Sequence, residues 1–179
     1  MKNKMLRLGM VLLLSSVVFS ACKKYEEGPG LSLKSKNARL TGEWELTEYS
    51  YTRTTEEGTT TRKFEGSLMM FTGKEYNGWD YVDTTYSYPY SMKLTIEKEG
   101  TYEWYEIEDG EIDEWTAYWS WMDGKSGKEL LLLSDDGTFK INKLKNKELI
   151  LVNDYSYSGT YNGNLDFSET ERTWTFEKK

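Results

Sequence analysis

The chain has 179 residues, 15% of them aromatic, with 23 basic side chains against 30 acidic ones and no histidine. The net negative charge repels nucleic acid and anionic lipid, so we do not expect the chain to bind either through charge. The lack of histidine removes the commonest general base and the commonest metal ligand.

The first 21 residues have the features of a secretory signal peptide. Basic residues precede an apolar run from Leu8 to Val18, which is shorter than the roughly 20 residues that a transmembrane helix needs. Ser20 and Ala21 stand directly before Cys22 and resemble the lipobox of bacterial lipoproteins. We therefore expect cleavage before Cys22, lipidation of that residue, and a monomer anchored by lipid to the outer membrane, facing the periplasm or the cell surface. The alternative is an ordinary signal peptide followed by an unrelated cysteine.

Residues 22–34 are polar and contain glycine and proline, which predicts a flexible tether. Ser35 is a suitable N-cap for one helical turn that ends near Leu40. Residues 35–179 form the expected folded domain.

Period-two alternation of bulky and polar side chains predicts β-strands over most of this domain. The expected strands are residues 42–53, 67–72, 92–96, 101–107, 111–122, 130–133, 138–144, 148–152 and 170–176. Tyr49 and Tyr51 change parity within the first of them, which indicates a bulge or bend. Three polar segments, residues 54–66, 73–90 and 153–166, are expected to be loops or irregular edge strands.

Short turns connect most of these strands. Asp109-Gly110, Asp123-Gly124 and Asp136-Gly137 favour tight hairpins because they reach positive φ at low cost. Short connections make successive strands antiparallel neighbours. An open sheet would leave two exposed edges, whereas closure removes them. We therefore predict an all-β, antiparallel up-and-down meander of roughly 8–10 strands closed into a barrel, with one short N-terminal helical turn.

Several stretches resemble one family. Gly42-Glu43-Trp44 is similar to the Gly-x-Trp motif that opens the first strand of lipocalins. Residues 28–40 and parts of residues 119–151 are similar to lipocalin-like lipoproteins of Bacteroidetes bacteria. The resemblance implies a calycin-type, lipocalin-like barrel and little about function. It also implies that Arg172 packs over Trp44 to seal one end of the barrel, with Arg39 as the rival for that place.

Seven tryptophans and fourteen tyrosines are the most informative remaining feature. A ligand inside the barrel would meet rings and hydroxyls from two predicted strands. The residues concerned are Trp104, Trp115, Trp119, Trp121, Tyr102 and Tyr118. The alternative, which we favour, is that these rings fill the barrel, because eight strands leave an interior only just wide enough for side chains.

Residues 76–90 form a second candidate surface. Flat rings and carboxylates together resemble the composition of carbohydrate-binding surfaces. The residues concerned are Tyr76, Trp79, Tyr81, Tyr86, Tyr88 and Tyr90, with Asp80 and Asp83. The alternative is a loop that folds back over one end of the barrel.

The sequence thus predicts a non-catalytic module that binds a small apolar or planar ligand in or at the mouth of a β-barrel. The alternative is an interaction protein that acts through its loops, as a glycan-capture accessory, an inhibitor or an assembly factor. No Gly-rich phosphate loop, nucleophile elbow or metal cluster is present in the sequence, and no carboxylate stands out as an acid or nucleophile. We expect no catalysis, no cofactor and no metal.

Overall fold

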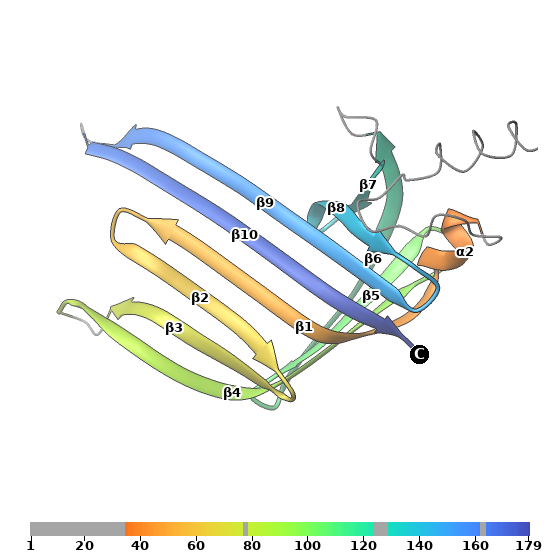
Figure 1. Cartoon of the computed structure of the whole chain (residues 1–179), viewed down its shortest axis with the longest axis horizontal. Helices are drawn as coiled ribbons and strands as arrows, with labels where there is room; N and C mark the ends of the chain where they lie inside the picture. Colours follow the sequence, from red (N-terminus) through yellow and green to blue (C-terminus); the bar gives the residue numbers. More distant parts are fainter. Residues whose placement is uncertain (1–34, 77–78, 124–128, 162–163) are drawn as a thin grey trace, which may run out of the picture.

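The computed structural model describes residues 35–76, 79–123, 129–161 and 164–179. These residues form one short helix followed by a closed antiparallel barrel of ten strands (Figure 1). The elements are α2 (Lys36–Leu40), β1 (Gly42–Thr55), β2 (Gly58–Glu65), β3 (Leu68–Tyr76), β4 (Tyr81–Ile96), β5 (Thr101–Glu108), β6 (Glu111–Asp123), β7 (Glu129–Leu133), β8 (Gly137–Leu144), β9 (Glu148–Tyr161) and β10 (Asn164–Lys178). The predicted all-β, up-and-down barrel is confirmed. Within the described part of the chain, no helix has the length and apolar character needed to cross a membrane.

Strand β1 changes partner along one of its edges. Its first residues, 42–45, pair with residues 93–96 of β4, whereas residues 49–55 pair with β2. The β2–β3 hairpin is therefore inserted between β1 and β4 along only part of their length. Without that hairpin, eight of the ten strands make the ring at the end where α2 lies.

A curved sheet projects beyond this ring. Six strands contribute to it, namely β9, β10, β1, β2, β3 and the first half of β4 (Figure 1). Among the described residues, 81–89 of β4 and 154–161 of β9 pair with a strand on only one side. We name this six-stranded sheet, beyond the ring, the extension.

The extension corrects part of the strand prediction. The loops predicted within residues 54–66, 73–90 and 153–166 are instead mostly regular strands of β1 to β4, β9 and β10. These segments are polar because both faces of the extension meet solvent in places, and that polarity imitates a loop. Their threonine and tyrosine content nevertheless suits a pleated strand. The edge-strand alternative describes residues 81–89 and 154–161.

Two local predictions on the strands are confirmed. A register shift between Leu46 and Glu48 brings Tyr49 onto the same face as Leu46, which is the predicted parity change. Asp109 and Gly110 have φ values of 50° and 87°, as a two-residue hairpin turn requires. In the Asp123-Gly124 turn, Gly124 lies outside the described residues.

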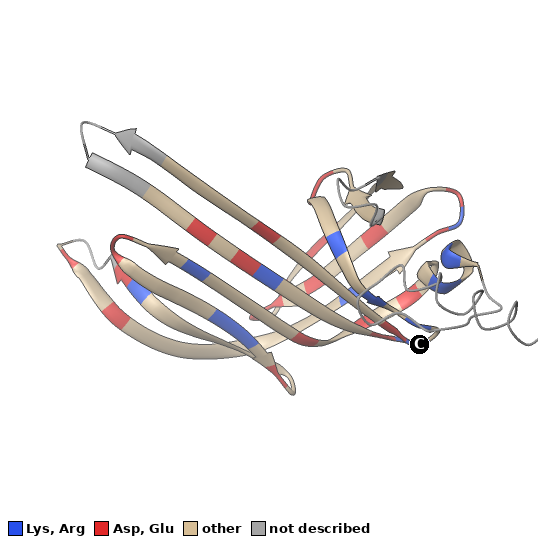
Figure 2. Ribbon diagram, turned by 45° about the horizontal axis from the view of Figure 1, so that its top comes forward, with Lys and Arg blue, Asp and Glu red and all other residues tan. Residues whose placement is uncertain are grey.

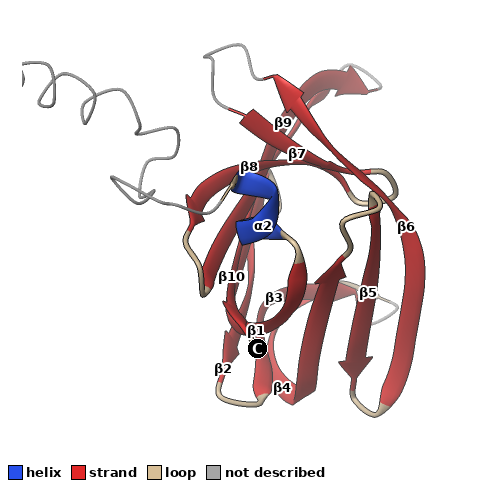
Figure 3. Ribbon diagram, turned by 90° about the vertical axis from the view of Figure 1, so that its right-hand side faces the viewer, coloured by secondary structure: helices blue, strands red, loops and turns tan. Residues whose placement is uncertain are grey.

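The helix α2 closes the eight-stranded end of the barrel (Figure 3). The Ser35 hydroxyl accepts a hydrogen bond from the Ala38 N–H, which makes Ser35 the predicted N-cap. Leu40 is fully buried, and its carbonyl oxygen accepts a hydrogen bond of 2.7 Å from the Trp44 indole. The helix is thereby joined to the first strand of the barrel.

The predicted packing of Arg172 over Trp44 is wrong. Register pairs Trp44 with Lys178, and the Lys178 ammonium lies 4.8 Å from the Trp44 ring centroid. That ammonium also donates to the carbonyl oxygens of Arg39 and Thr41. Arg172 lies further along β10, opposite Tyr51, so it cannot reach this end. The rival Arg39 offers its carbonyl, not its guanidinium, to this cluster.

Candidate functional site

The interior of the closed ring is filled by side chains. Tyr102, Trp104 and Trp119 are 0%, 6% and 8% exposed. Trp104 stacks on Trp115 with ring centroids 5.6 Å apart, and Trp119 meets Trp121 edge to face at 6.1 Å. These five predicted interior residues thus belong to the core or pack against it.

The polar atoms of these rings are already satisfied by the protein. The Tyr102 hydroxyl donates to Asp136 at 2.7 Å, and the Trp119 indole donates to the Glu97 carbonyl at 2.8 Å. The Trp121 indole donates to the Asn37 side chain in α2 at 2.8 Å. Because a ligand would have to displace these bonds, the interior rings act as core rather than as a site.

Tyr118 is not an interior residue, and its prediction is wrong. Its side chain is 71% exposed, whereas its neighbours Ala117 and Trp119 are buried. Alternate residues of a strand face opposite sides of the sheet, so the parity that places Trp119 inside places Tyr118 outside.

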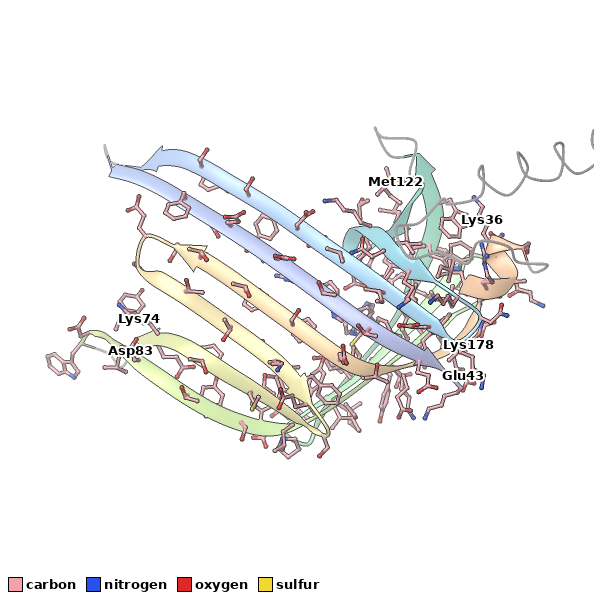
Figure 4. The ribbon with its side chains drawn as sticks, viewed as in Figure 1. Lys36, Glu43, Lys74, Asp83, Met122 and Lys178 are labelled. Carbon is pink, nitrogen blue, oxygen red and sulfur yellow. The ribbon has the colours of Figure 1, made fainter. Side chains whose placement is uncertain are left out.

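The aromatic residues predicted between 76 and 90 do not share one surface. Tyr86 and Tyr88 lie at alternate positions of β4, and Tyr90 is buried in the core. Trp79 and Tyr81, 93% and 49% exposed, lie at the far tip, where Figure 4 labels Asp83 close to Lys74. Tyr76 ends β3, and its side chain lies outside the described part of the structure.

The inner face of the extension carries ordered rows of side chains. Cross-strand registers place one row directly against the barrel core. We name it the floor row, and it runs across β4, β3, β2, β1, β10 and β9 as Tyr88, Met69, Phe64, Tyr49, Trp174 and Leu151. Most of its members are buried, so the floor row continues the core into the extension.

The next row outward combines rings with guanidinium groups. We name it the arginine row, and it runs over the same six strands as Tyr86, Phe71, Arg62, Tyr51, Arg172 and Asn153. The guanidinium carbons of Arg62 and Arg172 lie 6.0 and 5.4 Å from the Tyr51 ring centroid. Arg62 also lies 5.9 Å from the Phe71 centroid. Both cations are thus held against aromatic faces.

This face gathers positive charge in an acidic chain. Three of the five arginines of the sequence lie on it: Arg53, Arg62 and Arg172. Arg53 lies one row beyond Tyr51, and its Nε donates to the Ser168 hydroxyl at 3.2 Å. Figure 2 shows basic residues on β10, β1 and β2, the neighbouring strands of the extension. Within the described residues, none of the three forms an ion pair with a carboxylate.

The β5–β6 hairpin supplies an acidic wall to the same mouth. Glu106 and Glu108 follow the buried Trp104 at alternate positions of β5, so all three face inward. Together with Glu111 and Asp113 they border a pocket of about 580 Å³. The mouth is therefore polarised between arginines on the extension and carboxylates on the hairpin.

Two tyrosines of the floor row, Tyr49 and Tyr88, have pKa values that depend on these arginines and carboxylates. Burial raises the pKa of Tyr49 to about 12, although Arg172 and Arg62 oppose that rise. Burial also raises the pKa of Tyr88, with a further rise from its hydrogen bond to Glu108. These hydroxyls remain protonated donors at neutral pH.

The arginine row was not predicted, because Arg62 stands in a segment expected to be a loop and Phe71 stands beside another. A usable signal was present: Arg62 and Phe64 alternate, as do Arg172 and Trp174. Once all these segments pair as strands, alternation brings the arginines onto the face that the core aromatics occupy.

Cys22, the signal peptide of residues 1–21 and the tether of residues 22–34 lie outside the described residues. The described residues contain no group of three acidic or sulfur side chains arranged to hold a metal ion.

Comparison with protein-family models, with curated proteins and with solved structures found no match to this chain.

Proposed function

We propose that this protein is a non-catalytic binding module of the bacterial envelope whose ligand lies on the inner face of the extension. The single observation that supports this is a continuous apolar floor row bordered by a half-exposed arginine row. Accessible aromatic rings can stack on a small ligand that has a planar apolar body. In this proposal the ligand occupies the mouth of the barrel rather than its filled interior.

Exposure supports this location. Tyr86, at one end of the arginine row, is 42% exposed, and its ring stacks on Phe71 with centroids 4.9 Å apart. Tyr155 and Tyr157 on β9 are 50% and 56% exposed. A planar molecule placed here would cover rings that now meet water, which is the favourable contribution that apolar burial makes to binding.

The position of α2 supports the orientation that a lipid anchor would impose. The described chain begins at Ser35, beside α2, at the end of the barrel opposite the tip of the extension (Figure 1). If Cys22 carries lipid in the outer membrane, as we propose for a lipocalin-like lipoprotein, a short tether holds the closed end nearest the membrane. The extension then opens away from the membrane, toward solutes.

A fluorescent planar probe tests the proposal. The full chain with Cys22→Ser, which removes the proposed lipid site, would be titrated with neutral 1-anilinonaphthalene. We expect saturable binding that Tyr86→Ala weakens by about fivefold, since a stacked ring contributes about 1 kcal/mol. Tyr118→Ala, which removes an exposed ring from the outer face, is the matched control. No binding, or equal loss in both variants, would contradict the proposal.

A second candidate function is contact with a glycan through the tip between β3 and β4. The observation that favours it is the 93% exposed Trp79, with exposed Tyr81 and Val82 beside it. Exposed apolar side chains that form a contiguous patch rimmed by polar residues are typical of interaction surfaces. A glycan array with the Cys22→Ser chain should then give signals that Trp79→Ala abolishes and Tyr118→Ala retains. An array without signals would eliminate this candidate.

A further inference from the structure

We infer that the ligand of the extension is an amphipathic organic anion whose carboxylate or sulfonate head is held by Arg62 and Arg172. The inference rests on the proposed function, because it assigns the ligand class of the same inner face. Its apolar body would lie against the rings of the arginine row, beside the exposed Tyr86, and its head against the two guanidinium groups.

The first support is the state of the two guanidinium groups. Arg62 and Arg172 are the cross-strand partners of Tyr51 on its two sides. Their contacts within the described residues are with aromatic faces, which leave the terminal N–H donors of the guanidinium plane available. A planar fork of donors matches a carboxylate or sulfonate, and stacking fixes that fork before the ligand arrives.

The second support is a set of buried polar atoms without partners. The Nε of Arg172 and the Oγ1 of Thr170 are buried and make no hydrogen bond. Thr170 is 1% exposed and is the cross-strand partner of Arg53, one row beyond Arg172 on β10. An unsatisfied buried donor costs about 1–3 kcal/mol, so such atoms are rare unless a partner is supplied from outside. An anionic head bound at the terminal nitrogens of Arg172 would offset part of that cost.

The third support is the distribution of opposite charge. The chain has seven more acidic than basic residues, yet no carboxylate pairs with these arginines in the described residues. Glu106 and Glu108 remain on the β5–β6 hairpin, where they bond to tyrosine and indole groups of the mouth. The carboxylates would repel an anionic head, so the head is directed to the β2–β1–β10 side and the ligand has one orientation.

A matched pair of probes separates the anion site from the stacking surface. Neutral 1-anilinonaphthalene and its 8-sulfonate have the same rings and differ by one negative charge. In the full chain with Cys22→Ser, we expect Arg172→Gln and Arg62→Gln each to weaken binding of the sulfonate about tenfold. Both substitutions should change binding of the neutral probe less than twofold. Arg172→Lys, which keeps the charge and loses the fork, should give an intermediate loss.

Lys63→Gln is the control, because Lys63 precedes Phe64 on β2 and points to the outer face beside Arg62. It should leave both probes unaffected, and near-ultraviolet circular dichroism should show that every variant keeps its packing. The anion site is overturned if sulfonate affinity survives both arginine substitutions, or if Lys63→Gln lowers it equally. In either case, continued binding of the neutral probe would still support the proposed function. Failure of both probes to bind the parent chain overturns both proposals.

Discussion

Lys178 links the short helix α2 to the first and last strands of the barrel. Its ammonium lies over the Trp44 ring and donates to the last carbonyls around α2. Gly42 makes room for it, because a Cβ at that position would lie 2.7 Å from the Lys178 Cε. The Gly-x-Trp segment therefore takes part in the packing around α2, and its cation is a lysine at the end of β10 rather than Arg172.

Lys178→Met should destabilise the protein while keeping most of the packing of the side chain. The substitution removes a charged donor from two carbonyl oxygens, which we expect to lower the free energy of unfolding by about 1–2 kcal/mol. Urea unfolding followed by tryptophan fluorescence measures the change. Lys179→Met, in an exposed pair with Glu45, should leave the unfolding midpoint almost unchanged. Equal effects of the two substitutions would show that Lys178 is only a surface charge.

Tyr49 should make the stability of the protein depend on alkaline pH. Burial raises its pKa from 10.0 to about 12 in the folded state. Between these values the folded chain binds more protons than the unfolded chain, so stability is complete below pH 10 and falls as the pH rises toward 12. Urea midpoints at pH 8, 10 and 11.5 should therefore fall less steeply for Tyr49→Phe than for the parent chain. Tyr118→Phe, on the exposed outer face, should leave the parent slope intact, and identical slopes for all three chains would contradict the assignment.

At the scale of elements, the ring was predictable and the extension was not. The alternating tryptophans of β6 indicate a strand because one face of that strand is buried and apolar. The Asp-Gly pairs indicate where such strands turn. Residues 54–66 and 73–90 lack that contrast because their inner face is itself partly polar. The alternation of Arg62 with Phe64 is a signal for a strand, but the arginine row exists only once β2 is aligned between β1 and β3.

Gly73→Ala should destabilise the extension. Gly73 lies opposite Thr60 of β2, and an added Cβ would lie 2.7 Å from the Thr60 Oγ1. Overpacking of this kind costs about 1–3 kcal/mol, which urea unfolding would detect. Thr60→Ala removes the two nearest atoms, so the double variant should recover part of the loss. A Gly73→Ala variant as stable as the parent would mean that β2 and β3 are less closely packed than the structure shows.

At the scale of the whole molecule, a filled ring and an open extension have different roles. The ring buries Trp44, Tyr102, Phe139 and Phe176 to 2% exposure or less. Among the described residues, the two edge segments of the extension, 81–89 of β4 and 154–161 of β9, pair with a neighbouring strand on one side only. Side chains toward the tip of the extension are exposed. We therefore expect the ring to supply most of the stability and the extension to supply accessible surface.

Hydrogen exchange should reveal this division. Amides of residues 93–96 and 42–46 lie in the ring and should exchange only on global unfolding. Amides near residues 81–85 and 154–157 lie on the edges and should exchange at least about tenfold faster through local opening. Peptide-resolved mass spectrometry measures both. Uniform protection of the two groups would show that the extension is as stable as the ring.

A crystal structure of the Cys22→Ser chain with bound 1-anilinonaphthalene-8-sulfonate would test the location of the site most directly. We expect the rings of the probe against Tyr51 and Phe71, with the sulfonate within about 3 Å of Arg172 or Arg62 nitrogen atoms. A probe found among Trp104 and Trp119 inside the ring, or solely on the outer face of the barrel, would contradict a binding site on the extension.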